Sequence, residues 1–231
     1  MQLTDLQGSL QGQLTLAVES SAKYFVPHLF AAFKQQQPDI NLHLTVVNRA
    51  QVIKRLADNR DDLVIMSLVP PDMALEFLPF LNYPIVAVAP PGHPLGKATA
   101  LNLRELEPYP LLVREAGSGT RKACEEYFQQ KRVHFPQKYE ISSLEAVREG
   151  VVAGLGLALL PRHSVTQELA NGRLLELPVE ELPLYRSWCV VHARGKRLSP
   201  VAQAFLDYIR SERTQISALG QTFSGYCPTA H

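Results

Sequence analysis

The sequence has few cysteines, no surplus of charge of either sign and no long apolar segment. Its three cysteines, Cys124, Cys189 and Cys227, form no C-x-x-C pair, which excludes a disulfide framework and favours a reducing compartment. Lysine and arginine total 23 against 22 acidic residues, which argues against a broad electrostatic surface for nucleic acid or an anionic membrane. No segment approaches the roughly 20 apolar residues of a membrane span, and no export signal is visible at the amino end. We therefore expect a soluble, cytoplasmic protein with no membrane partner.

The motifs of common enzymes are also missing. There is no G-x-S-x-G elbow and no H-E-x-x-H pair, and the histidines show no metal-ligand spacing. The segment Gly92–Lys97 imitates a phosphate-binding loop, but it has three residues between its glycines and Ala98 where the metal-binding hydroxyl belongs. Cys124 lies beside Glu125 and Glu126, whose charges disfavour a thiolate. These absences favour a binding protein over an enzyme, with no metal and no cofactor.

The sequence does contain a regular alternation of strand and helix patterns. Hydrophobic residues make up 46% of 231 residues, enough for the core of one large domain or two small ones. The punctuated segment Pro90–Pro94 is where we expect the chain to cross between two subdomains. The alternation predicts an α/β fold with mainly parallel strands. The expected strands are 14–18, 41–47, 62–66, 85–89, 111–113, 157–160 and 188–191, and the expected helices are 25–36, 49–59, 121–130, 144–153 and one beginning at Ser199-Pro200.

Short polar residues lie at four expected strand-to-helix junctions: Ser20-Ser21, Asn48-Arg49, Gly117–Arg121 and Ser142-Ser143, the last of which follows Tyr139-Glu-Ile. In parallel sheets, ligands bind outside the carboxyl ends of the strands, where helix amino termini face outward. The two serine doublets are equivalent positions in two half-molecules, so two opposed helix ends can grip one ligand across a cleft. Helix capping alone, through accepted N–H bonds, is the alternative for each of these residues.

The arginines and glycines at these junctions point to an anionic ligand. Glycines in the segment Gly117–Thr120 let backbone amides approach an anion, and the helix dipole adds about half a positive charge there. Guanidinium groups bind carboxylates and phosphates bidentately, although solvated surface arginines are the alternative. We therefore expect a small phosphorylated or carboxylated metabolite. The candidate effector-binding residues are Ser20, Ser21, Asn48, Arg49, Arg114, Ser118, Thr120, Arg121, Ser142 and Ser143.

Three segments carry a family resemblance: Gly-His-Pro-Leu at 92–95, Gly-Leu-Gly-Leu-Ala-Leu-Leu-Pro at 154–161 and Leu-Ser-Pro at 198–200. With the order of the elements, they make residues 12–213 similar to the effector-binding domain of LysR-type transcriptional regulators. Asn48-Arg49 and the segments 114–121 and 191–200 resemble the branch that controls carbon-dioxide fixation and inorganic-carbon uptake operons.

The resemblance implies two Rossmann-like subdomains joined by two crossover strands, as in type II periplasmic binding proteins. Subdomain I would comprise residues 12–87 and 191–213 and subdomain II residues 88–190, with a linker remnant at 1–11 and a disordered tail at 214–231. An effector between the subdomains would touch the two serine doublets. In the carbon-fixation branch, effectors are sugar phosphates and related metabolites such as ribulose bisphosphate or phosphoglycolate.

The resemblance also implies partners. Family members form homodimers or homotetramers, and Val26–Phe33 is the expected contact because it offers more apolar surface than one sheet face covers; the alternative is that all of it is core. Operator DNA would be bound only through an amino-terminal helix-turn-helix that this chain lacks. The rival interpretation is a solute-binding protein of a transport system, which shares the architecture and is disfavoured by the missing export signal.

Overall fold

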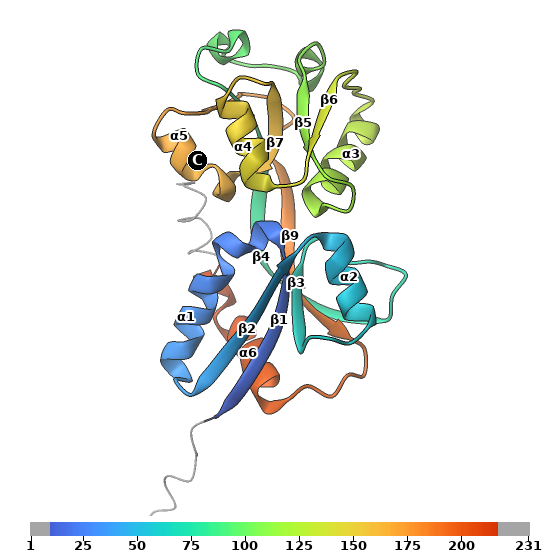
Figure 1. The fold of residues 1–231 in the computed structure, drawn as a ribbon, viewed down its shortest axis with the longest axis vertical. Helices are drawn as coiled ribbons and strands as arrows, with labels where there is room; N and C mark the ends of the chain where they lie inside the picture. The colour runs from blue at the N-terminus through green and yellow to red at the C-terminus, as the bar shows by residue number, and fades with distance from the viewer. Residues whose placement is uncertain (1–9, 217–231) are drawn as a thin grey trace, which may run out of the picture.

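The computed structural model describes residues 10–216, and these residues form two lobes (Figure 1). Two long strands, β4 (Leu75–Ala89) and β9 (Leu184–Ala193), run between the lobes as a ribbon. Lobe I comprises β1 (Gly12–Glu19), the 3-10 helix η1 (Ser20–Tyr24), α1 (Val26–Gln36), β2 (Ile40–Val47), α2 (Arg49–Ala57), β3 (Leu63–Met66) and α6 (Pro200–Ser211). Lobe II comprises η2 (Pro94–Lys97), η3 (Leu103–Leu106), β5 (Leu111–Arg114), α3 (Gly119–Lys131), β6 (Lys138–Ile141), α4 (Leu144–Val152), β7 (Leu157–Pro161), η4 (Arg162–Ser164), α5 (Thr166–Ala170) and β8 (Leu175–Glu176).

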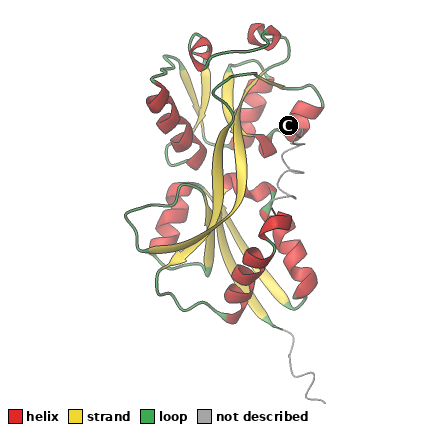
Figure 2. Ribbon diagram, turned by 180° about the vertical axis from the view of Figure 1, so that it is seen from behind, coloured by secondary structure: helices red, strands yellow, loops and turns green. Residues whose placement is uncertain are grey.

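The strands follow the order β2-β1-β3-β9-β4-β7-β5-β6, and β8 pairs with β4. Pairing is parallel within each lobe, between β1 and its neighbours β2 and β3 and between β5 and its neighbours β6 and β7. The ribbon strands β4 and β9 pair antiparallel with each other from Leu75 to Ile85. Helices lie on both sides of the strands in each lobe (Figure 2). The predicted fold class, two Rossmann-like units joined by two crossover strands, is confirmed.

The ribbon strands are longer than the sequence pattern predicts. The prolines at 79 and 84 interrupt the pattern of β4, so only its last part reads as a strand; Pro79 lies at a register shift, where an edge or a bulge tolerates proline. Because β4 already pairs with β7 from Ile85 onward, the chain crosses between the lobes within β4. The segment Pro90–Pro94, where we expected the crossing, follows it.

An aromatic cluster joins both lobes to the ribbon. Trp188 on β9 is fully buried and stacks on Tyr83 of β4, with ring centroids 4.8 Å apart. Phe25 of lobe I lies 5.5 Å from the Trp188 ring, and His163 of lobe II lies 5.7 Å from the Tyr83 ring. Each buried aromatic ring contributes about 2–3 kcal/mol of apolar burial, so this cluster holds the lobes near one relative orientation.

The apolar residues of α1 belong to the core of lobe I. Val26, Leu29, Phe30 and Phe33 are all buried, and the Phe33 ring packs 5.1 Å from that of Phe205 on α6. Pro27 and Ala31 of the same helix are exposed, so subunit pairing through Val26–Phe33 stays a prediction.

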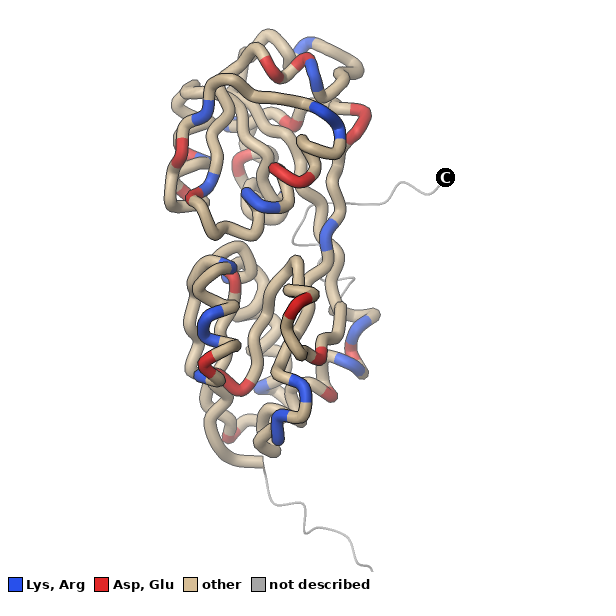
Figure 3. Tube along the Cα trace, turned by 90° about the vertical axis from the view of Figure 1, so that its right-hand side faces the viewer, with Lys and Arg blue, Asp and Glu red and all other residues tan. Residues whose placement is uncertain are grey.

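The remaining sequence expectations concern the domain limits and the charge. The subdomain limits at 87/88 and 190/191 stay a prediction, and the expected linker and tail lie outside the described residues except for 10–11 and 214–216. Basic and acidic residues are interspersed over both lobes in Figure 3, in keeping with totals of 23 and 22. Within residues 10–216, no helix has the length and apolar character of a membrane span, and no cluster of three or more His, Cys, Asp or Glu is arranged to hold a metal.

Candidate effector site between the lobes

The carboxyl ends of the strands of both lobes meet at the boundary between the lobes. Parallel register places Glu19 beside Val47 in lobe I and Arg114 beside Ile141 in lobe II, so the residues that follow these strands lie along two facing edges. The Arg114 Nη2 donates a hydrogen bond to Ser20 Oγ at 3.2 Å, which joins the edges directly. Ser20 and Arg114 therefore meet across the boundary, while the convergence of all four junctions on one ligand-binding crevice stays a prediction.

Arg114 is the buried cation of this crevice, with only 4% of its surface exposed. Its Nε donates to Glu115 Oε2 at 2.8 Å and its Nη2 to Glu115 Oε1 at 3.1 Å. Its Nη1 is buried and has no hydrogen-bond partner within residues 10–216. An unsatisfied buried donor costs about 1–3 kcal/mol, so a ligand oxygen that reaches this nitrogen gains a hydrogen bond that the empty crevice lacks.

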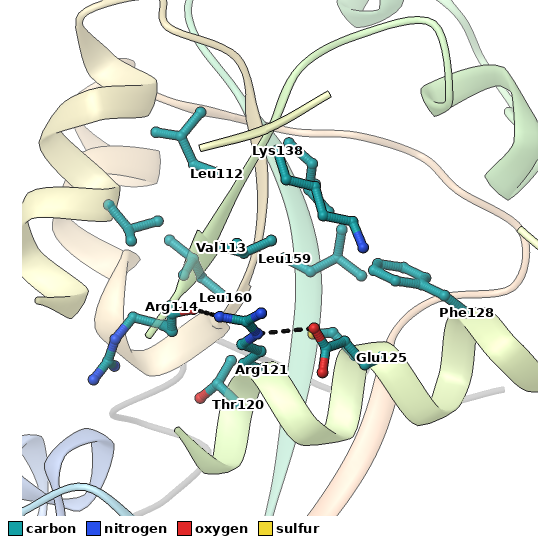
Figure 4. A pocket seen from close by; sticks show the side chains of 13 residues that line it. Leu112, Val113, Arg114, Thr120, Arg121, Glu125, Phe128, Lys138, Leu159 and Leu160 are labelled. Carbon is teal, nitrogen blue, oxygen red and sulfur yellow. Dashed lines mark hydrogen bonds and ion pairs between the residues drawn. The ribbon is translucent and has the colours of Figure 1, made fainter. Parts of the chain in front are cut away.

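Figure 4 shows that Arg114 points away from the mostly apolar pocket inside lobe II and toward lobe I. That pocket lies among β5, β7, α3 and α4 and has a volume of about 20 Å³, little more than one water molecule needs. A metabolite does not fit there, and the guanidinium group is directed at the crevice instead.

Glu19 has a buried carboxyl group at the same boundary between the lobes. It ends β1, is 2% exposed, and accepts hydrogen bonds from Ser67 N at 3.1 Å and Ser67 Oγ at 3.2 Å. It also lies against the first turn of α3 in lobe II, since a Cβ added at Gly119 would stand 2.4 Å from Glu19 Oε2. Burial raises the pKa of Glu19 to about 8, against the lowering effect of the Ser67 hydrogen bonds and of the positive charges of Arg49 and Arg114. Sequence reasoning missed this residue, which directly follows the predicted strand 14–18.

On the side of α2 and α3 the lobes are closed onto each other. Ala50 N donates to Gly117 O at 3.1 Å, and Asn48 Nδ2 donates to Glu115 Oε1 at 3.4 Å. Gly117 has a positive φ of 94°, and a Cβ there would stand 3.0 Å from the Ala50 Cβ. The glycines of the turn therefore serve the close approach of the other lobe; their expected role, the approach of backbone amides to an anion, stays a prediction.

On the opposite side, η1 of lobe I contacts η4 and the start of α4 in lobe II. Lys23 and the Tyr24 hydroxyl both bond Glu145 Oε1, and Ser143 Oγ donates to Glu145 Oε2 at 3.0 Å. Burial raises the pKa of Glu145, but the hydrogen bonds from Lys23 and its other donors outweigh burial and lower it to about 2.

His163 of η4 bonds the carbonyl oxygen of Ser21 through Nε2, at 2.9 Å. Burial lowers the pKa of His163 to about 4, so the ring is neutral at pH 7 and donates from Nε2.

The predicted serines divide into crevice contacts and helix caps. Ser20 and Ser21 contact lobe II, through the hydroxyl and the carbonyl oxygen respectively. Ser118 and Ser143 cap α3 and α4 by accepting from Arg121 N and Ala146 N, which is the alternative that capping statistics favour. Ser142 is exposed at the end of β6.

The other predicted residues also divide. Asn48 caps α2 in a capping box and reaches lobe II, as described above. Thr120 is buried in the first turn of α3. Arg49 donates through Nε and Nη2 to Leu68 O, and Arg121 is paired with Glu125 and Glu140, at 2.8 and 2.5 Å. These two arginines line the outer groove between α2 and α3, of about 480 Å³, while their charges are engaged by their own lobes.

Comparison with known proteins agrees with the architecture. The family model of the LysR substrate binding domain matches residues 7–214. The HTH-type transcriptional activator CmpR of Synechocystis sp. is 41% identical over 93% of this chain and 71% of its own length. The RuBisCO operon transcriptional regulator of Allochromatium vinosum is 39% identical over 93% of this chain and 71% of its own length.

Solved structures give the same result. The regulatory domain of Synechocystis CcmR in complex with 2-PG is 36% identical, with a TM-score of 0.84, over 90% of this chain and 100% of that chain. The effector binding domain of QuiR in complex with shikimate, at 22% identity and a TM-score of 0.80 over 89% of this chain and 99% of that chain, shares the fold. None of these relatives favours the transport-protein alternative. This chain belongs to the LysR substrate-binding domain family: it is the effector-binding domain of a LysR-type transcriptional regulator, with relatives that regulate RuBisCO operons.

Proposed function

We propose that the crevice between the lobes binds a small metabolite that carries a phosphate, a carboxylate or both. The observation that supports this most is the buried Arg114 guanidinium at the lobe boundary, whose Nη1 has no hydrogen-bond partner among the described residues. Charge-assisted hydrogen bonds to an anion are about twice as strong as neutral ones, so an anionic oxygen is the best partner for this nitrogen. The complex of the 36% identical CcmR domain with 2-PG makes 2-phosphoglycolate the first ligand to test.

The residues around Arg114 have different roles in this proposal. Ser20 shares its hydroxyl between Arg114 and the ligand, and Asn48 reaches the crevice from the cap of α2. The outward-facing N–H groups at the start of α3, near Ser118 and Thr120, favour negative charge. Ser21, Ser142 and Ser143 approach the ligand from the sides. Arg49 and Arg121 contact it only by exchanging their present partners.

Effector binding acts through the relative position of the lobes. A ligand that bonds both lobes binds the closed arrangement better than an open one, and this difference in affinity is the free energy available for regulation. In the whole regulator, the change would alter the geometry of a homodimer or homotetramer and thereby its hold on operator DNA. The DNA contacts would lie in the part of such regulators that this chain does not match. We propose a cytoplasmic regulator without enzymatic activity.

Calorimetric titration of the chain with 2-phosphoglycolate and with ribulose bisphosphate tests the proposal. Arg114→Met keeps the apolar stem and removes the charge; loss of a charged hydrogen bond, about 1.5–3 kcal/mol, weakens binding about 10- to 100-fold. Ser20→Ala weakens it less, by about twofold to tenfold. Arg173→Met is the matched control, because that guanidinium is half exposed and paired with Glu149 on the surface of lobe II. Unchanged affinity in both Arg114→Met and Ser20→Ala would show that the site is elsewhere.

A further inference from the structure

We propose that Glu19 is a proton-binding positioning residue of the crevice, whose carboxyl group must be neutral for an anion to bind beside it, so that effector binding is coupled to proton uptake. This inference rests on the proposed anion site. It adds one requirement for binding to the contacts made by Arg114 and the serines: the neighbouring carboxyl group must be uncharged.

The position of Glu19 carries the inference. It immediately precedes Ser20, whose hydroxyl accepts from Arg114, and its carboxyl group lies between β1 of lobe I and Gly119 of lobe II. The side chain is 98% removed from solvent, since 2% of the residue is exposed. An anion held by Arg114 and Ser20 therefore shares a water-poor space with this carboxyl group, where like charges repel strongly.

No cation neutralises the carboxyl group directly. Among residues 10–216 no lysine, arginine or histidine nitrogen forms an ion pair with Glu19, and both of its oxygens bond Ser67. Arg49 on α2 and Arg114 on β5 act on it only at longer range, because Arg49 donates to Leu68 O and Arg114 to Glu115 and Ser20. A buried acid without an ion pair resists ionisation, in keeping with a pKa of about 8.

The other groups that face Glu19 keep their protonation state between pH 7 and pH 9. Tyr83 on β4 and Cys189 on β9 feel its charge, and burial raises the pKa of both, that of Cys189 to about 11. Arg49 and Arg114 stay charged. Gly119 on α3 offers only backbone. A phosphate monoester with a second pKa of about 6 is about nine-tenths dianion at pH 7 and almost wholly dianion at pH 8, so Glu19 dominates the pH dependence in this range.

The size of the pH effect on binding can be calculated from the pKa of Glu19 alone. If the anion binds only the domain with neutral Glu19, the apparent Kd is the intrinsic Kd divided by the neutral fraction of Glu19. With a pKa of about 8, the Kd for 2-phosphoglycolate rises about tenfold from pH 7 to pH 9. At pH 8 about half of the molecules take up a proton on binding.

Calorimetry with 2-phosphoglycolate in buffers of different ionisation enthalpy measures both quantities. Wild type should show the tenfold rise and the uptake of about half a proton at pH 8. Glu19→Gln keeps a carbonyl oxygen for Ser67 N but cannot ionise, so its Kd should be constant over this range and its proton uptake absent. Glu126→Gln, an exposed residue of α3 paired with Lys122, is the matched control and should behave as wild type.

The outcomes separate the two proposals. Binding with a pH-independent Kd and no proton uptake in wild type overturns the role of Glu19 and leaves the anion site standing. The same pH dependence in Glu19→Gln as in wild type does so as well. No binding of the anion by wild type at any pH overturns the proposed function, and the inference with it. The wild-type proton count decides the question even if Glu19→Gln fails to fold.

Discussion

A methyl group added at Gly119 should hold the two lobes apart. Gly119 opens α3, and its Cβ would stand 2.4 Å from Glu19 Oε2 and 3.1 Å from Glu19 Cδ, across the boundary between the lobes. Its backbone needs no glycine, because it is not among the residues of positive φ within 10–216. Gly119→Ala therefore strains the contact between the lobes while leaving each lobe intact.

The expected magnitude is the sum of two losses. Overpacking a tight contact costs about 1–3 kcal/mol, and parting the lobes also loses the Ala50 N to Gly117 O bond, worth about 0.5–1.5 kcal/mol. Alanine favours the helix over glycine by up to about 1 kcal/mol. The helix gain is the same in the closed and the parted arrangement, so the penalty on the closed arrangement is about 1.5–4.5 kcal/mol. It weakens 2-phosphoglycolate binding at least about tenfold, with little change in the melting temperature.

Calorimetry measures the change in ligand affinity, and thermal unfolding separately measures the change in stability. Gly150→Ala is the matched control, because its Cβ would meet Leu112 Cδ2 at 2.6 Å within lobe II. It should lower stability and leave affinity unchanged. Glu19→Asp withdraws the carboxyl group by one methylene and should restore part of the affinity lost in Gly119→Ala, as a double-mutant cycle would show.

Wild-type affinity in Gly119→Ala would refute the reasoning. So would a fall in melting temperature equal to that of Gly150→Ala, since that result places the strain inside lobe II and not between the lobes.

Three further predictions concern the same boundary. Burial lowers the folded-state pKa of His163 from 6.5 to about 4, so the unfolded chain takes up the proton first as the pH falls. Chemical denaturation should therefore show that the free energy of unfolding falls by up to about 3 kcal/mol between pH 6.5 and pH 4 in wild type and not in His163→Gln. An equal fall in both proteins would contradict this. Trp188, the chain's one tryptophan, is fully buried in the aromatic cluster. Acrylamide should quench its fluorescence more in Gly119→Ala than in wild type, and 2-phosphoglycolate should reduce the quenching in wild type. Identical quenching in all states would argue against lobe movement. Affinity for 2-phosphoglycolate should fall as salt rises, because charge attracts the ligand, and salt-insensitive binding would favour a neutral effector.

The sequence predicts the architecture and the location of the crevice well. Parallel strands that end in short polar residues fix one edge of each lobe, and the caps at Asn48, Ser143 and Ser199 are where the pattern places them. The helix α3 begins at Gly119, two residues before its predicted start, with Ser118 as its cap. These features depend on neighbouring residues and on strand direction, which a sequence displays. The residues that end the strands are therefore predictable from local rules.

Contacts between distant segments are less predictable. Arg121 is predicted to face the ligand, but Glu140 of β6 holds it along its own lobe. Glu19 resembles any surface glutamate in sequence, and its burial arises only when Ser67 and Gly119 pack around it. The length of β4 is concealed because two of its residues are prolines; Pro79 lies at a register shift, and Pro84 pairs in regular register with Tyr185 of β9. Each case is decided by a partner far away in the chain.

A crystal structure of the chain with 2-phosphoglycolate tests the anion crevice most directly. We predict a phosphate or carboxylate oxygen within about 3.2 Å of Arg114 Nη1, with Ser20 Oγ as a second partner and Glu19 beside the ligand. A ligand found in the outer groove between α2 and α3, or a bound structure in which Arg114 Nη1 still lacks a partner, would contradict the proposal.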